Sequence, residues 1–455
     1  MTTHRPTTPG TSPTQSPTKT TRSTSKSTSR NRRRTLVALT LAGLTLSSLA
    51  ACGRDATSAG GEAQSDAIDD SPATGTIEVW AMGAEGEALD DFTQAFEKEN
   101  PDADVEVTAI PWDSAHDKIQ GAITSGQGPD VTLVGSTWMG EFGASGGLMP
   151  TPEGLVDSGD FFTGAWEGNQ VGGTQYGVPW YVETRVLYYR SDLAKKAGWT
   201  SPPQTWDELK QFASDLQTKA GVDYGISLQP GQTGSWQTFL PFAWSDGAEL
   251  ANDDGTEWTL DSDAMKESLD YYSSFFTDGL AQTHVMDAGE LESGFADGTY
   301  GSFVSGPWHA ALVEDAGVDP SDYAVAPIPG PDGPGSSFVG GGNLAVLTDA
   351  ENPDGAWKLV RWLEQPDVQQ DFYDTVGDLP ANSTAWKSGD LADDEQLAVF
   401  GDQLDRAVSP PAVPTWEQVA DVIDGRVERT TKGLEDVDQA VEEMQSEASS
   451  VGTGL

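Results

Sequence analysis

Aromatic, acidic and amide side chains gather at four places where predicted β-strands end. These places are residues 82–86, 135–138, 179–185 and 340–343. Ligands of open α/β sheets bind outside the carboxyl ends of the strands, so side chains at these places are candidates for binding. Aromatic rings can stack on apolar faces of a ligand, and carboxylate, amide and guanidinium groups can hydrogen-bond to its polar groups.

Three of these places contain aromatic or acidic residues that could contact a ligand directly. Trp138 follows a predicted strand that ends near residue 134. Trp180 and Tyr181 are adjacent, and we expect one of the two to face a cleft. Glu85 follows the first predicted strand and could accept hydrogen bonds from hydroxyls. An exposed carboxylate with no ligand is an equally good interpretation of Glu85 in so acidic a chain.

The remaining candidates could shape a site as well as contact a ligand. Glu183 and Arg185 point to the same side of a strand because side chains alternate, so they could form a salt bridge, bind a ligand, or do both. Gly341 and Gly342 precede Asn343. Because glycine has no side chain and tolerates positive φ, this segment lets the backbone approach closely. The family resemblance given below implies that it is a hinge crossing that also lines the cleft. A hinge without ligand contact is the alternative.

The elements that must position these residues follow from the spacing of apolar side chains. Strands are predicted at residues 76–80, 105–110, 129–134 and 186–189. Helices are predicted between the first three strands and at residues 265–276, 355–364, 419–427 and 434–444. One further helix begins with a capping box formed by Thr205 and Glu208. Strands that alternate with helices predict an α/β fold around a mostly parallel sheet.

The charge of the chain is strongly negative and unevenly distributed. Asp and Glu total 72 and Lys and Arg total 25, which gives a formal net charge of −47. This argues against a nucleic-acid partner, because phosphate binding needs clustered cations. The residues before Cys52 include no acidic side chain and end in an apolar run at residues 35–49. We therefore expect residues 1–51 to be a signal peptide with a basic, disordered n-region.

Cys52 is the only cysteine, so an intramolecular disulfide is impossible. The sequence Leu49-Ala50-Ala51-Cys52 resembles the bacterial lipobox, and this resemblance implies that Cys52 is lipidated, for instance with palmitate, and becomes the mature first residue. Residues 52–74 are rich in Gly, Ala, Ser and Asp and are expected to form a flexible tether. The folded body would then hang from the outer face of the cell membrane.

Five segments, in order, give the chain a family resemblance. They lie at residues 77–80, 125–131, 177–189, 305–308 and 338–344. The chain resembles the extracellular solute-binding proteins of carbohydrate ABC importers, the group that includes the maltose-binding proteins. The resemblance implies a type II periplasmic-binding-protein-like fold, in which two hinged α/β lobes close on a ligand and the permease recognises the closed form. The implied lobes are residues 75–183 plus 338–384, and residues 184–337 plus 385–455.

The resemblance also implies roles for particular residues. Family members use the position of Thr137 and Trp138 to touch sugar, and they often have a ligand carboxylate near the position of Glu183. Trp308 corresponds to a tryptophan that stacks on sugar in this family. Trp236 follows a predicted loop, and we expect it to be a second stacking platform, with core packing as an equally good interpretation.

Two other functions remain open from the residues alone. A secreted glycoside hydrolase would need two carboxylates about 5–9.5 Å apart, and a chain with 72 acidic residues supplies such pairs by chance. A metal-binding protein of the same fold could use adjacent tyrosines such as Tyr188-Tyr189 or Tyr271-Tyr272. We expect a monomeric, non-enzymatic sugar-binding lipoprotein without a cofactor or metal, whose partners are the carbohydrate, the ABC permease and the membrane.

Overall fold

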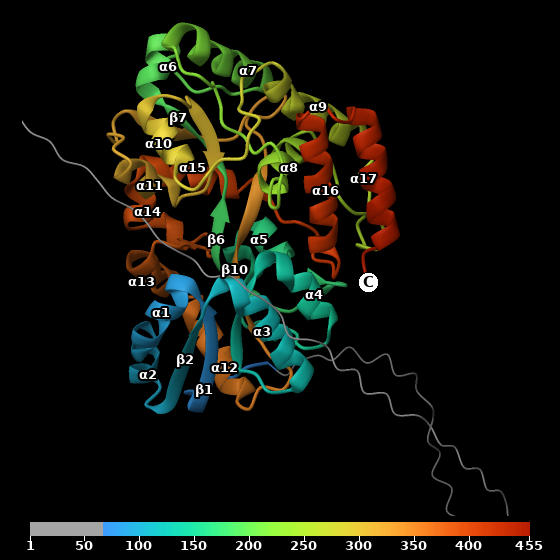
Figure 1. Ribbon diagram of the computed structural model, residues 1–455. Helices are drawn as coiled ribbons and strands as arrows, with labels where there is room; N and C mark the ends of the chain where they lie inside the picture. Colours follow the sequence, from blue (N-terminus) through green and yellow to red (C-terminus); the bar gives the residue numbers. More distant parts are fainter. Residues whose placement is uncertain (1–66) are drawn as a thin grey trace, which may run out of the picture. The chain divides into compact units, whose positions relative to one another are not determined.

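A seven-stranded sheet, a three-stranded sheet and the helices around them organise the part of the chain that the structure describes, residues 67–455 (Figure 1). A third, two-stranded sheet pairs β4 (Gln170–Val171) with β5 (Thr174–Gln175). The structure is a computed structural model. The expected signal peptide and the expected lipidation site at Cys52 lie outside the described residues. Within residues 67–455, no helix is both long enough and apolar enough to cross a bilayer.

The larger sheet has the strand order β11-β6-β10-β3-β1-β2, with β12 also paired to β10. Its strands are β1 (Thr74–Met82), β2 (Asp102–Ile110), β3 (Val131–Gly135), β6 (Val178–Thr184), β10 (Ser337–Val346), β11 (Leu379–Pro380) and β12 (Ala407–Val408). Strands β1, β2 and β3 are parallel, as expected. Strand β10 returns antiparallel to both β3 and β6, so the sheet is mixed rather than mostly parallel.

Helices that follow the first strands cover this sheet (Figure 1). They are α1 (Gly83–Phe92), α2 (Gln94–Glu99), α3 (Trp112–Ser125), α4 (Met139–Ala144), α5 (Thr163–Glu167), α12 (Pro353–Leu363) and α13 (Pro366–Val376). The single helix predicted between the first two strands is divided at Thr93. The Thr93 hydroxyl donates a hydrogen bond to the carbonyl of Asp90 at 3.2 Å, a local bond of the kind that competes with a continuous helix.

The smaller sheet is antiparallel, with β7 (Val186–Arg190) between β8 (Ser302–Ser305) and β9 (Tyr323–Ala326). The nearby helices are α6 (Ser191–Ala197), α7 (Trp206–Asp215), α8 (Trp236–Ser245), α9 (Asp263–Thr277), α10 (Glu290–Asp297), α11 (His309–Asp315), α14 (Asp390–Asp393), α15 (Glu395–Leu404), α16 (Trp416–Thr431) and α17 (Val437–Val451). Thr205 caps α7 as predicted, since its hydroxyl accepts from the Glu208 N–H at 3.3 Å. The Glu208 carboxylate accepts from the N–H of Gln204 instead of completing the box at Thr205.

Two large hydrophobic cores fill the molecule, and β10 belongs to both. One core surrounds the larger sheet and extends to Tyr188 and Phe303 of the smaller sheet. The other lies among α8, α9, α16 and α17, and it includes Phe338 at the start of β10. The chain therefore passes between the two halves along β10 and again at the junction of β6 and β7.

The residues just before β1 are bound to the body, although they were expected to belong to the flexible tether. The buried ammonium of Lys358 lies 2.9 Å from Asp69 and 2.9 Å from Asp354. Arg361 donates to the carbonyl of Asp69 at 2.9 Å. Ala73 is completely buried. Residues 69–73 thus pack against the body before the first strand begins, because two cations of α12 hold the chain there.

Candidate functional site

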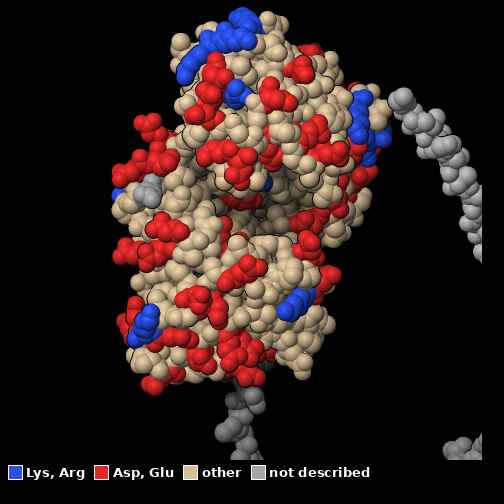
Figure 2. Space-filling view, turned by 60° about the vertical axis from the view of Figure 1, so that its left-hand side comes forward, with Lys and Arg blue, Asp and Glu red and all other residues tan. Residues whose placement is uncertain are grey.

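A cavity of about 820 Å³ opens between the two sheets. Figure 2 shows the molecule hollowed between its upper and lower halves, with Asp and Glu side chains around the opening. Both halves contribute to the lining, from the loop after β3, strand β6 and strand β10 on one side to helices α11 and α15 on the other. This volume falls within the range of small-molecule binding sites.

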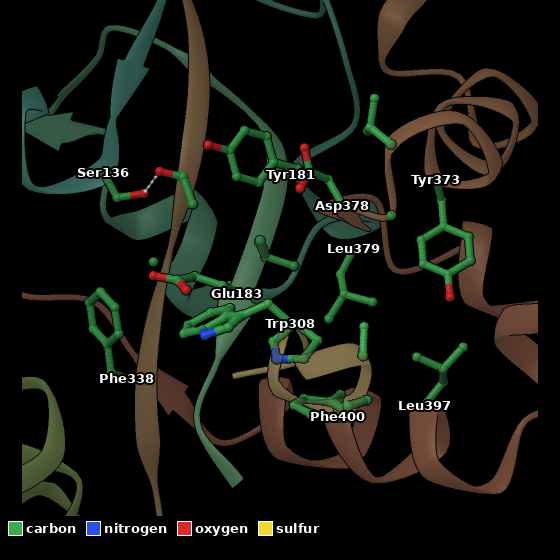
Figure 3. A pocket seen from close by; sticks show the side chains of 18 of the residues that line it. Ser136, Tyr181, Glu183, Trp308, Phe338, Tyr373, Asp378, Leu379, Leu397 and Phe400 are labelled. Carbon is green, nitrogen blue, oxygen red and sulfur yellow. Dashed lines mark hydrogen bonds between the residues drawn. The ribbon is translucent and has the colours of Figure 1, made fainter. Parts of the chain in front are cut away.

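Polar groups dominate one wall of the cavity. Tyr181 and Glu183 project from β6, and Asp378 follows Gly377, which ends α13 in a left-handed conformation. Ser136 lies directly after β3, where its hydroxyl donates to the carbonyl of Gly341 at 3.0 Å. Figure 3 shows Tyr181 and Asp378 on the same side of the cavity. The strand ends thus bring hydroxyl and carboxyl groups together. This agrees with the tendency of open α/β sheets to bind ligands outside the carboxyl ends of their strands.

An indole and apolar side chains form the opposite wall. Trp308 immediately precedes α11, and Leu397 and Phe400 project from α15 (Figure 3). A Cβ on Gly306 would lie 2.1 Å from the Trp308 ring, so the glycine provides the space in which the indole lies. Trp308 is 42% exposed, which is unusual for an indole in a cleft of a folded protein.

Arg185 links the two walls. Its guanidinium donates to the Glu183 carboxylate at 2.8 Å and to the Gln237 side-chain carbonyl at 2.6 Å. The same guanidinium carbon lies 4.6 Å from the centre of the Trp308 ring, a cation–π distance. Glu183 forms the predicted salt bridge with Arg185, and its carboxylate also lines the cavity. The pair can therefore hold this carboxylate in place for a ligand, as both interpretations of the pair allow.

Glycines in β10 allow Tyr181 to lie close against the strand. Gly341 has φ +126°, and a Cβ there would lie 2.1 Å from the carbonyl oxygen of Tyr181. A Cβ on Gly342 would lie 2.5 Å from the Tyr181 ring. Only glycine fits at Gly341, since other residues rarely adopt this φ and the space is already filled.

The acidic wall is not fully ionised at neutral pH. Burial, reinforced by the negative charges of Glu85 and Glu183, raises the pKa of Asp378 to about 8. Burial and the neighbouring charge of Glu85 also raise the pKa of Tyr181. Atom Oδ2 of Asp378 is buried and has no hydrogen-bond partner within the described chain. A hydrogen bond with the Glu85 side chain also favours the neutral form of Asp378, so the two carboxyl groups act together at this wall of the cavity.

Half of the residues proposed from the sequence line this cavity. They are Thr137, Trp138, Tyr181, Glu183, Trp308 and Gly341. Trp138 is supported by Trp112, whose ring centre lies 5.6 Å away, and Trp112 lines the cavity as well. The other six lie around the cavity without lining it: Glu85, Trp180, Arg185, Trp236, Gly342 and Asn343.

Two of the candidate tryptophans, Trp180 and Trp236, are buried in the core. Adjacent residues of β6 point to opposite faces, so Tyr181 faces the cavity while Trp180 packs on Phe372 at 4.6 Å. Trp236 starts helix α8 instead of lying in a loop, and its indole packs edge-on against Phe338 and Trp416, both at 5.0 Å. Neither ring is in a position to stack on a ligand in this cavity.

The remaining candidates support the cavity from behind. The side-chain carbonyl of Asn343 accepts from Asn169 at 2.7 Å, and its amide donates to the carbonyl of Val134 at 3.3 Å. These bonds join β10 to β3 and to the segment that follows α5, and Asn343 is buried. Glu85 is also buried, and its negative charge helps to raise the pKa of Asp378, which lines the cavity.

Several lining residues were not proposed from the sequence, chiefly Asp378, Gln237, Phe338, Tyr373, Leu397 and Phe400. Asp378 carried a weak signal, because it lies between Gly377, which ends a helix, and the short strand at Pro380. The aromatic and apolar residues of α13 and α15 have the spacing of ordinary core positions. Within residues 67–455, no three His, Cys, Asp or Glu side chains are grouped so that they could hold a metal ion.

Known proteins resemble this chain in sequence and in fold. The family model described as bacterial extracellular solute-binding protein matches residues 81–370. A putative binding protein of Brucella abortus is 28% identical over 371 residues, which are 80% of this chain and 90% of that protein. The diacetylchitobiose binding protein DasA of Streptomyces coelicolor is 27% identical over 406 residues, which are 85% of this chain and 91% of that protein. The solved structure of the sugar-binding protein MalE from Xanthomonas citri is 34% identical, with a TM-score of 0.77, and the match covers 83% of this chain and 97% of that one.

Proposed function

The chain belongs to the bacterial extracellular solute-binding proteins, and from this premise we propose that it captures an oligosaccharide in the cavity between its two sheets. It is the solute-binding component of a sugar ABC importer, and its two-lobe α/β fold is that of the MalE-like proteins. Relatives named for diacetylchitobiose and for sugar support a carbohydrate ligand. A cavity of about 820 Å³ is large enough for more than one sugar unit, which favours an oligosaccharide over a monosaccharide.

The exposed indole of Trp308 is the observation that carries this proposal. The ring lines the cavity, and Arg185 lies against it. The free surface of the ring can stack on the C–H groups of a sugar. Glu183 and Asp378 on the opposite wall can accept from, or donate to, its hydroxyls. An apolar platform facing hydrogen-bonding groups matches the two kinds of surface that a sugar presents.

The lobes that close on the sugar are proposed to be residues 75–183 plus 338–384 and residues 184–337 plus 385–455. The junction of β6 and β7 and the glycines of β10 are the crossings that would bend. Arg185 lies at the first crossing, where its N–H donates to the Ser337 hydroxyl at 3.2 Å and its carbonyl accepts from the same hydroxyl at 2.8 Å. These bonds tie the two crossings together, so they would move as one hinge.

The protein is proposed to reach its ligand while tethered outside the cell membrane. The basic leader, the apolar run and the lipobox-like segment that ends at Cys52 support export followed by lipidation. The permease subunits of the importer would be its protein partner, and the binding protein itself would act as a monomer. Replacing Cys52 by Ser should release the protein from the membrane fraction, whereas retention of the variant there would contradict lipid anchoring.

Ligand binding tests the central proposal. Purified protein is heated with maltose, maltotriose, cellobiose, diacetylchitobiose, xylobiose and longer members of each series, and the melting temperature is recorded. A ligand that binds only the folded state raises the melting temperature, so at least one series should do so. No response to any of these sugars would contradict the proposal.

A search for reaction products distinguishes binding from hydrolysis. The sugar that binds best is incubated with the protein and the mixture is analysed for shorter products. We expect the sugar to be recovered intact, because the relatives are binding proteins. Release of shorter sugars that disappears in a Glu183→Gln variant would instead identify a glycoside hydrolase.

A further inference from the structure

The cavity between the two sheets carries acidic side chains without cations to match them. Four carboxyl groups line it, those of Glu183, Glu314, Asp378 and Asp394, and Figure 2 shows Asp and Glu side chains around its opening. Within the described chain, no Lys, Arg or His lines this cavity. The imbalance is unusual for a site that is to hold a neutral ligand, because each unpaired carboxylate loses water when the site closes.

An adjoining cavity of about 390 Å³ shows that acidic residues are not spread evenly over this region. It shares Gln237 and Trp308 with the first cavity. Among residues 67–455, no Asp or Glu lines the adjoining cavity, although the chain carries 72 acidic residues. The carboxyl groups are therefore gathered in one cavity and are not simply a sample of an acidic chain.

Only one of the four carboxylates is neutralised by the protein itself. Glu183 pairs with Arg185 at 2.8 Å, and Arg185 lines the adjoining cavity and not the first one. Glu314, Asp378 and Asp394 form no ion pair with any described residue. A positively charged ligand would therefore gain an attraction in this cavity that a neutral ligand of the same shape would not.

Two of the unpaired carboxylates are held in fixed positions by hydrogen bonds. The carboxylate of Glu314 accepts from the hydroxyl of Tyr323 at 2.8 Å. The carboxylate of Asp394 caps α15, where it accepts from the N–H groups of Gln396 at 2.7 Å and Leu397 at 3.0 Å. Glu314 and Asp394 are exposed, so their attraction for a ligand is screened by salt over about 10 Å at 0.1 M ionic strength.

Deeper in the cavity, Asp378 already carries a positive charge in the form of a proton. Burial and the charge of Glu85, which is 7% exposed, raise the pKa of Asp378 to about 8. The other charged groups that act on Asp378 are also negative, since Glu183 raises its pKa further. A ligand ammonium beside Asp378 would favour the ionised carboxylate, so it would displace this proton.

We propose that the ligand of this cavity is a cationic oligosaccharide, one that carries a protonated amine where a neutral sugar has a hydroxyl. The proposal rests on the proposed function, since it names the class of the same ligand. It requires that the amine increases affinity, that salt weakens this effect, and that binding releases protons. Sugars with carboxylate or sulfate groups should be excluded, because no cation lines the cavity within the described chain.

Pairs of sugars that differ only in one kind of group test the proposal. Oligomers of β-1,4-linked glucosamine are compared with cello-oligosaccharides of the same length, which carry a hydroxyl in place of each amine. Malto- and xylo-oligosaccharides are converted at the reducing end either to the amino-alditol or to the alditol. Calorimetry is done at about pH 6.5, where the amines are protonated. In at least one pair the amine should bind about tenfold more tightly or better, and it should lose this advantage between about 0.05 and about 0.5 M salt.

Substitutions that remove charge and keep shape identify the source of the preference. Glu314→Gln retains an acceptor for Tyr323, and Asp394→Asn retains a residue that caps helices well. Each should lower the ratio of the amine affinity to the hydroxyl affinity, and the double variant should lower it further. Asp315→Asn is the matched control and should keep the ratio, since Asp315 is exposed beside Glu314 but does not line the cavity.

Proton release gives a second readout that a purely steric preference for the amine would not move. Calorimetry in two buffers of different ionisation enthalpy should show that the aminated sugar releases protons on binding, that its hydroxyl partner does not, and that Asp378→Asn abolishes the release. Equal affinity within every pair, or binding only by sugars that lack an amine, would overturn the cationic ligand and leave the proposed function standing. No binding by any sugar, aminated or neutral, would overturn both.

Discussion

The guanidinium of Arg185 lies against the ring of Trp308, with 4.6 Å between the guanidinium carbon and the ring centre. The same group holds Glu183 and Gln237, which come from different elements. The indole is therefore positioned by a charge network that exists without ligand. A stacking surface that is already fixed loses little side-chain entropy when a sugar binds, so this contact contributes to affinity at low cost.

Replacing Trp308 with Ala should weaken sugar binding more than it weakens the fold. Loss of a stacking ring is expected to cost about 2 kcal/mol of binding free energy, or roughly thirtyfold in Kd. Stability should change by less than about 1 kcal/mol, because the indole is 42% exposed. Calorimetry and denaturant unfolding measure the two quantities. Leu312→Ala is the matched control, since Leu312 is equally exposed on α11 but does not line the cavity.

Arg185→Gln should lower the free energy of unfolding, by about 3 kcal/mol, because it leaves the Glu183 carboxylate unpaired in a mostly buried setting. Glu183→Gln alone should cost less, and the double variant should recover part of the loss. Denaturant unfolding of the four proteins in a double-mutant cycle gives the coupling energy. Strictly additive effects would show that the two side chains do not act as a pair.

The raised pKa of Asp378 should make stability depend on pH. Its carboxyl group keeps its proton up to a pH of about 8 in the folded protein but loses it near 3.8 when unfolded. The folded state therefore binds more protons between these values, so this contribution to stability is complete below about pH 4 and is lost as the pH rises through about 8.

Asp378→Asn isolates that contribution, because Asn cannot ionise. The melting temperature of the variant minus that of the natural protein should increase from pH 5 to about pH 8 and level off above it. Asp374→Asn, at an exposed position in α13, the helix that ends just before Asp378, is the control and should show a difference that stays flat. A flat difference for Asp378→Asn as well would mean that its carboxyl group ionises normally.

Gly341→Ala should disrupt the crossing strand. The φ of +126° disfavours any other residue, and the new Cβ would lie 2.1 Å from the Tyr181 carbonyl oxygen. We expect a loss of about 3 kcal/mol or more in the free energy of unfolding. Gly146→Ala separates the two causes, since Gly146 also has a positive φ, of +76°, but has open space around it. That variant should lose only about 1 kcal/mol; equal losses would rule out the close approach as the cause.

The sequence predicts strand ends well because periodicity and strand breakers are local. The first three predicted strands correspond to β1, β2 and β3, and the strand predicted at residues 186–189 corresponds to β7. The capping signal at Thr205 likewise depends on neighbours within four residues. These predictions needed no knowledge of distant contacts, and the structure confirms them.

The exposure of individual rings could not be predicted in the same way. Trp308 and Trp236 both follow glycine-containing segments, yet one is exposed and the other is packed between Phe338 and Trp416. The difference depends on side chains more than 70 residues away in sequence. Asp378 was missed for the same reason, since its unusual environment comes from Glu85 and Glu183 on other elements.

The contacts of α12 fix the end of the body at which the described chain begins. Lys358 and Arg361 bind the segment around Asp69, just before β1 begins. The residues that line the cavity, such as Trp112 and Ser136, follow the opposite ends of the parallel strands β2 and β3. The tether proposed for the preceding residues would therefore join the body at the end of the sheet away from the cavity.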